Sequence, residues 1–200
     1  MLKAIVLWTS VGIGGFSIAC SSSTSAVGSV RSPLRDEMQH VLEMRAPRYA
    51  GNGEKADALR FVKTDLIAWT VQRGDASDSL IKKYEIARSD ASSTGRSAFF
   101  RDVATLQLDF CREFIMAGAS AAPRSIRADP HLYDTYVGAL AGVVETRLDQ
   151  AIREADACMA SAPRTESATA ADCRKMRLEA SKLREQVGPT VQALDGATPL

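Results

Sequence analysis

Apolar residues recur every three or four positions along most of the chain, which is the spacing of one face of an α-helix. No run of five or more residues alternates between apolar and polar as a half-buried strand does. The sequence therefore predicts an all-α fold, with about six helices in a single bundle-like domain at residues 33–188. The expected helices are 32–46, 53–73, 77–91, 97–118, 129–160 and 168–187.

Several helix boundaries have a physical basis in the sequence. Ser32 and Asp129 are good N-cap residues, and the proline after each is tolerated at the first helical position. Pro47 ends the first helix, because a proline disfavours helical geometry in the residue before it. Gly74 serves as the predicted stop of the second helix, since glycine is the commonest residue just beyond a helix C-terminus.

The predicted helix at residues 97–118 is apolar over most of its circumference. A helix with so little polar surface is usually buried. We therefore predict that it is the central helix of the bundle. The narrow polar strip that we expect to face solvent consists of Arg101, Thr105, Asp109 and Arg112.

The first 19 residues follow another pattern. Lys3 precedes an uncharged, mostly apolar stretch from Ala4 to Ala19 of only 16 residues, and a membrane-spanning helix needs about 20. The order of a basic residue, an apolar stretch, small residues and Cys20 resembles the signal peptide of bacterial lipoproteins, with Ser17-Ile18-Ala19-Cys20 at the cleavage position. Ser17 departs from that pattern, which usually has an aliphatic residue there. An ordinary cleaved signal peptide and an uncleaved anchor are the alternatives.

The resemblance implies a domain organisation and a location. Residues 1–19 would be a removed signal peptide, and Cys20 would carry diacylglycerol and palmitate. Two or three acyl chains give stable membrane attachment. Residues 20–32 form a small, polar, flexible tether, and residues 189–200 a disordered tail. Ser21, which is not an aspartate, implies the outer membrane, so we expect a lipid anchor in the cell envelope and a domain that faces the periplasm.

Charge and motifs exclude several functions. The chain has 25 basic and 24 acidic residues, and loss of Lys3 makes the two counts equal, so no basic surface favours nucleic acid. The two histidines, His40 and His131, are far apart and belong to no metal-binding motif. No serine-nucleophile motif or glycine-rich phosphate loop occurs. We therefore predict no cofactor, no metal site and no enzymatic activity.

The cysteines indicate a disulfide. Cys158 and Cys173 each lie on the apolar face of a predicted helix, and an exported protein meets an oxidising environment in which disulfides persist. Their pairing would close a loop of about 15 residues, which contributes about 3 kcal/mol in the chain-entropy model. Alternatively, both are small core residues or one pairs with Cys111. We predict that Cys111 is the free thiol.

Gly138 and Gly142 lie four residues apart on the fifth predicted helix. Two glycines at this spacing make a smooth surface that another helix can approach closely. The charged residues Glu145, Arg147 and Asp149 follow, which excludes a membrane span. We expect a tight helix crossing within the bundle, and self-association is the alternative.

These observations favour a lipid-anchored helical domain of the cell envelope that acts by protein–protein interaction, as an accessory, adaptor or immunity-like protein. The partner is an unknown envelope protein. The alternative is a bundle that binds a small apolar ligand or non-covalent haem between its helices. For haem, the candidate ligands are His131 with Met38, Met44 or Met176.

Overall fold

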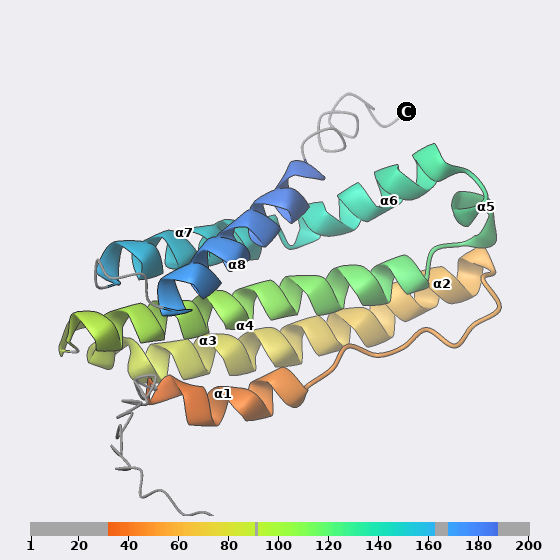
Figure 1. The fold of residues 1–200 in the computed structure, drawn as a ribbon. Helices are drawn as coiled ribbons and strands as arrows, with labels where there is room; N and C mark the ends of the chain where they lie inside the picture. The colour runs from red at the N-terminus through yellow and green to blue at the C-terminus, as the bar shows by residue number, and fades with distance from the viewer. Residues whose placement is uncertain (1–31, 91, 163–167, 188–200) are drawn as a thin grey trace, which may run out of the picture.

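The computed structural model describes residues 32–90, 92–162 and 168–187 (Figure 1). Every regular element in these ranges is helical, so the predicted all-α, bundle-like fold is confirmed. The predicted signal peptide, Cys20, residues 20–31 of the tether and the tail at 189–200 lie outside the described residues. The helices are α1 (Leu34–Glu43), α2 (Lys55–Phe61), α3 (Ile67–Asp90), α4 (Ser93–Ser120), α5 (Arg124–Arg127), α6 (Pro130–Val143), α7 (Glu145–Ser161) and α8 (Ala168–Glu185).

The predicted helix stop at Gly74 is wrong. A π-helical turn at Val62–Leu66 joins α2 to α3, and the helix then continues through Gly74 to Asp90. A Cβ atom at Gly74 would stand 2.9 Å from Nη2 of Arg147. That guanidinium group binds the carboxylate of Asp78 at 3.1 and 3.0 Å. Gly74 therefore gives Arg147 room to cross from α7 to α3.

The predicted helix at 129–160 is divided into α6 and α7. The division falls at Val144, whose backbone takes φ −105° and ψ 12°. Val143 and Val144 are both β-branched, and such side chains lose rotamer freedom in a helix. The short helix α5 occupies part of what the sequence predicts as a loop.

Helix α4 is the central helix, as predicted, with α1 and α3 on one side and α7 and α8 on the other (Figure 1). Its apolar side chains are almost entirely buried, including Val103, Leu106, Phe110 and Phe114. Helix α7 packs along α4 and buries a row of mostly small residues. This row consists of Leu148, Ala151, Ala155 and Cys158.

The polar strip of α4 does not simply face solvent, which corrects the prediction. Arg101 is only 9% exposed, and Asp109 binds Arg73 of α3 at 2.8 Å. Arg112 forms an ion pair with Glu179 of α8. The strip thus provides the polar contacts through which neighbouring helices attach to α4.

The two ends of α4 define two ends of the domain. At the proximal end, the described chain begins at Ser32, beside the first half of α4, and α7 ends at the same end of the domain (Figure 1). At the distal end lie α2, α5 and the first turns of α6. Ser32 does not cap α1, which corrects another prediction, because its hydroxyl donates to Asp102 at 2.6 Å.

Candidate functional site

The distal half of α4 is bordered by the loop that joins α1 to α2, and this loop is fixed through its backbone. Trp69 Nε1 and Arg73 Nη1 donate to the carbonyl oxygen of Met44 at 2.8 and 3.1 Å. The amide of Ala46 donates to Glu113 Oε2 at 3.1 Å. These bonds hold one wall of a surface depression in a defined position beside α4.

Arg73 is the central residue of this attachment, and its side chain is fully buried. A buried charge needs a partner, and Asp109 supplies it at 2.8 Å. Burial lowers the pKa of Arg73, while its bond to Asp109 raises it. The pair therefore fixes the loop to α4 through a guanidinium group that is shielded from solvent.

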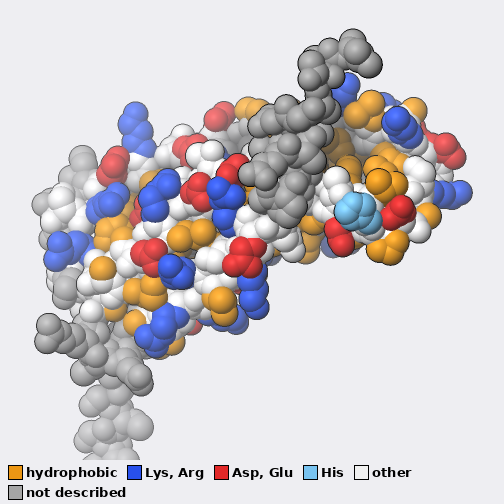
Figure 2. Space-filling view, turned by 90° about the horizontal axis from the view of Figure 1, so that it is seen from above, with side chains coloured by type: hydrophobic (Ala, Val, Ile, Leu, Met, Phe, Trp, Pro, Cys, Tyr) orange, Lys and Arg blue, Asp and Glu red, His pale blue; other side chains and the backbone are white. Residues whose placement is uncertain are grey.

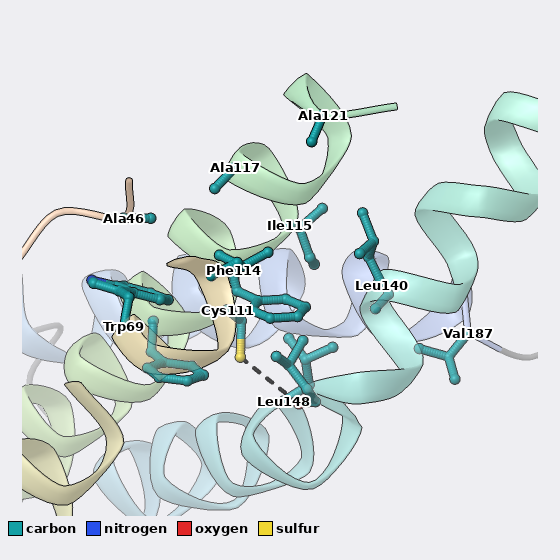
Figure 3. Packing of buried hydrophobic residues seen from close by; sticks show 14 of the residues in the cluster. Ala46, Trp69, Cys111, Phe114, Ile115, Ala117, Ala121, Leu140, Leu148 and Val187 are labelled. Carbon is teal, nitrogen blue, oxygen red and sulfur yellow. Dashed lines mark hydrogen bonds between the residues drawn. The ribbon is translucent and has the colours of Figure 1, made fainter. Parts of the chain in front are cut away.

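Helix α6 forms a wall of a second depression beside α4, and it crosses α4 at Gly118. A Cβ atom at Gly118 would lie 2.7 Å from both δ carbons of Leu140. Figure 3 shows Leu140 of α6 beside Ile115 of α4, within the same buried cluster. The Tyr136 hydroxyl donates to the Gly118 carbonyl at 3.0 Å, and burial raises the pKa of this tyrosine. Gly118 thus sets how closely the two helices approach.

The start of α6 is also well defined. Asp129 caps the helix, as predicted, and accepts from the amides of His131 and Leu132 at 2.9 and 3.3 Å. The amide of Arg124 in α5 donates to the Gly53 carbonyl at 3.1 Å. Gly53 has φ +84°, a conformation that favours glycine. The distal ends of α2, α5 and α6 are therefore joined by backbone contacts.

Two cavities open beside Met116, a side chain that is 59% exposed. The larger lies between α4 and α6 and has a volume of about 710 Å³. The smaller, about 560 Å³, lies between α4 and the fixed loop. The apolar wall of the larger cavity is formed by Ile115, Met116, Ala119 and Val137. Its polar side chains are His131, Tyr133, Asp134, Thr135 and Gln186.

The surface around these cavities has no large charge of one sign. In Figure 2, acidic and basic side chains alternate over most of the visible face, while apolar side chains gather over α5 and the start of α6. Exposed apolar residues at this end include Leu59, Met116 and Leu132. We call the two cavities together with these three residues the distal surface. Its chemistry suits apolar recognition, with polar groups for orientation.

The structure brings together only part of the predicted haem ligand set. His131 is exposed and lines the larger cavity. Met38 and Met176 pack in a cluster with Leu34 and Cys173, at the proximal end. Met44 lies in the loop beside Trp69. The methionine that shares a cavity with His131 is Met116. No group of three or more metal-ligating side chains occurs in the described part of the chain.

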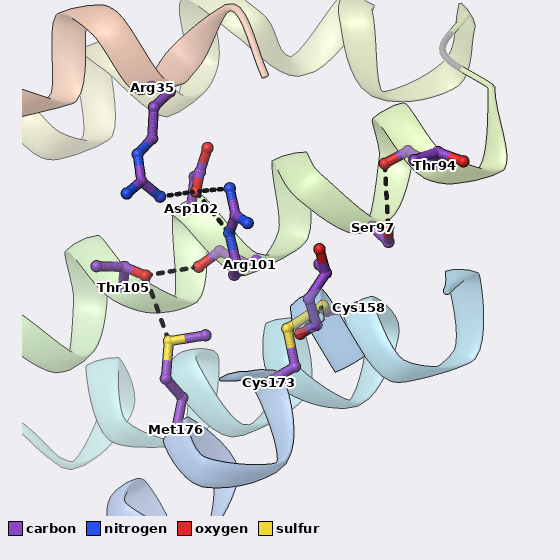
Figure 4. Close-up of a disulfide and its surroundings, with 10 residues drawn as sticks. Arg35, Thr94, Ser97, Arg101, Asp102, Thr105, Cys158, Cys173 and Met176 are labelled. Carbon is purple, nitrogen blue, oxygen red and sulfur yellow. Dashed lines mark hydrogen bonds and ion pairs between the residues drawn. A yellow bond between two sulfur atoms is a disulfide. The ribbon is translucent and has the colours of Figure 1, made fainter. Parts of the chain in front are cut away.

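The cysteines lie far from the distal surface or are inaccessible. Cys158 and Cys173, the predicted pair, are joined by a disulfide that links α7 to α8 (Figure 4). Cys111 is a buried free thiol, and burial raises its pKa to about 12. A thiol held in this neutral state is a poor nucleophile. This arrangement gives Cys111 a packing role in the middle of α4.

The predicted packing glycines are both on α6, where Gly138 is buried and Gly142 is half-buried. The crossing that requires a glycine, however, is at Gly118 of α4. Sequence reasoning did not select Gly118, Met116 or Asp134. For Arg73 the sequence holds a signal, since this residue follows Trp69 by four positions and so shares its apolar face.

None of the described helices is long and apolar enough to cross a bilayer. A comparison of the chain with protein-family models, with curated proteins and with solved structures found no match.

Proposed function

We propose that this protein is a lipid-anchored domain of the cell envelope that binds a protein partner through its distal surface. The lipid anchor rests on the N-terminal resemblance to lipoprotein signal peptides. The binding role rests on the geometry of α4. The observation that carries the proposal is that the described chain begins at one end of α4, while both large cavities and the exposed Met116 lie toward the other end.

This separation orients the domain. Ser32 binds Asp102, and Met116 lies 14 residues further along the same helix, or about 21 Å at 1.5 Å per residue. As a flexible coil, the predicted tether at residues 20–31 would reach about 20 Å. A membrane attached at Cys20 would therefore face the proximal end, and the distal surface would point away from the lipid toward other envelope proteins.

The lipid anchor is tested by metabolic labelling of the native protein with radioactive palmitate. We expect label in the wild-type chain and none in Cys20→Ala. An unlabelled wild-type chain would contradict the anchor.

The partner surface is tested in intact cells with a photo-crosslinking amino acid at Met116. The matched control is Leu178 of α8, which is exposed to nearly the same extent, 58% against 59%. We expect one discrete crosslinked protein from position 116 and none from position 178. Crosslinks of equal yield from both positions, or from neither, would reject the distal surface as the binding site.

A further inference from the structure

The larger distal cavity has the properties of a small-molecule site. Its volume of about 710 Å³ falls within the range of pockets that enclose drug-sized ligands. Its apolar wall comes from two helices, with Ile115, Met116 and Ala119 on α4 and Val137 on α6. These helices are held at a fixed spacing by the contact between Gly118 and Leu140. The wall therefore exists before any ligand arrives.

The polar side of this cavity has a definite charge preference. Asp134 is the only carboxylate that lines it, and the described lining contains no lysine or arginine. No residue in the part of the chain that the structure describes forms an ion pair with Asp134. This differs from Asp102 and Asp109, which both bind arginines. Asp134 is thus an acid available to a ligand.

Tyr133 lines the same side of the cavity. The face of an aromatic ring attracts a cation within about 6 Å of its centre. An apolar wall, a phenol ring and one carboxylate without a partner favour a ligand that is largely apolar and positively charged. An anion would meet the carboxylate with no compensating arginine or lysine.

We propose that the cavity between α4 and α6 binds small hydrophobic organic cations, with the apolar body against Ile115, Met116 and Val137 and the positive charge beside Asp134. This inference goes beyond the proposed protein contact, because it requires neither a partner nor a lipid anchor. Its failure would leave the crosslinking prediction intact, and the reverse also holds.

The test uses two ions of nearly equal size and opposite charge, tetraphenylphosphonium and tetraphenylborate, titrated into the purified full chain by calorimetry. We expect one phosphonium ion to bind per chain, and the borate to bind at least about threefold more weakly, since an exposed ion pair contributes modestly. Equal binding of the two ions, or no binding of the phosphonium, would overturn the proposal.

Three variants locate the site. Asp134→Asn should weaken phosphonium binding about threefold and leave borate binding unchanged or improved. Ala119→Phe fills the cavity and should lower phosphonium affinity at least about tenfold. Ala171→Phe, the same change at an exposed position of α8, is the control and should bind normally. Circular dichroism confirms that each variant is folded, and unchanged binding by Ala119→Phe would place the ion elsewhere.

Discussion

The two ends of α4 are built in opposite ways. At the proximal end, Asp102 is fully buried and accepts hydrogen bonds from Ser32, Arg35 and Arg101. The disulfide between Cys158 and Cys173 joins the nearby helices α7 and α8 (Figure 4). At the distal end, about 40% of the Met116 side chain is covered, and cavities open on both sides of it. One end holds a fully paired buried carboxylate, and the other presents the apolar side chain of Met116 to solvent.

The difference fits a helix that stabilises the fold at one end and provides the proposed binding surface at the other. A buried charge whose hydrogen bonds are all made fixes a unique packing, and it is costly to disturb. An exposed apolar side chain contributes little to folding and remains available to a ligand. Substitutions at the proximal end should therefore affect the whole fold, whereas those at the distal surface should affect binding.

The largest effect is expected from Asp102→Asn. This change leaves the buried Arg101 guanidinium without its counter-charge, and breaking a buried pair costs about 3–5 kcal/mol. Urea denaturation followed by circular dichroism measures the loss. Asp75→Asn, at an exposed position of α3, is the control and should change the free energy of unfolding by less than about 0.5 kcal/mol. Equal effects of the two changes would remove the contrast between the ends.

Loss of the disulfide is expected to cost slightly less. The double change Cys158→Ser and Cys173→Ser opens a loop of 15 residues, which lowers the free energy of unfolding by about 3 kcal/mol in the chain-entropy model. Thermal melts with and without dithiothreitol provide the measurement. The reductant should lower the melting temperature of the wild type and leave that of the double variant unchanged. A wild type that does not respond to the reductant would contradict this role.

Gly118→Ala tests whether the distal half of α4 needs its close contact with α6. Its new methyl group would clash with both δ carbons of Leu140, and overpacking of this kind costs about 2 kcal/mol. Gly142→Ala is the matched control on α6, where alanine should increase stability, because glycine costs about 1 kcal/mol inside a helix. Chemical denaturation compares the two. A stable Gly118→Ala protein would show that the helices can separate without cost.

The smallest predicted effect concerns the middle of α4. Burial raises the pKa of Cys111 from 9.0 to about 12, so above pH 9 the unfolded chain loses this proton while the folded chain keeps it. Stability should therefore fall as pH rises, by about 1.4 kcal/mol between pH 8 and 10. The same denaturation series on Cys111→Ala should lack this component, since its other titrating groups are unchanged. Parallel curves for the two proteins would contradict the buried-thiol assignment.

The predictable parts of the fold are those governed by local periodicity. The central position of α4 follows from its nearly continuous apolar circumference, and the cap at Asp129 follows from its sequence neighbours. Gly74 shows the limit of such reasoning. In the sequence, Gly74 after Arg73 predicts the end of a helix. In the fold it makes space for the side chain of Arg147, which is distant in sequence and near Gly74 only after folding.

The distal surface illustrates the same limit. Met116 lies on a helix whose other large apolar side chains are buried, and only the positions of α6 and of the loop at residues 44–49 leave it exposed. Nothing in the sequence around Asp134 distinguishes it from an ordinary solvent-exposed acidic residue of a helix, because the cavity that it lines forms only in the folded chain. Tertiary contacts, which the spacing of apolar residues does not encode, decide both cases.

The bond between Ser32 and Asp102 has a mechanical consequence. A pulling force applied to the residues before Ser32 reaches the domain at a buried carboxylate of the central helix, and that carboxylate is also held by Arg35 and Arg101. Two of the three donors, Ser32 and Arg35, come from outside α4, so such a force must break their bonds to the central helix as well as unwind α1. We expect tension on this segment to be borne first by α4 and not by the first turn of α1.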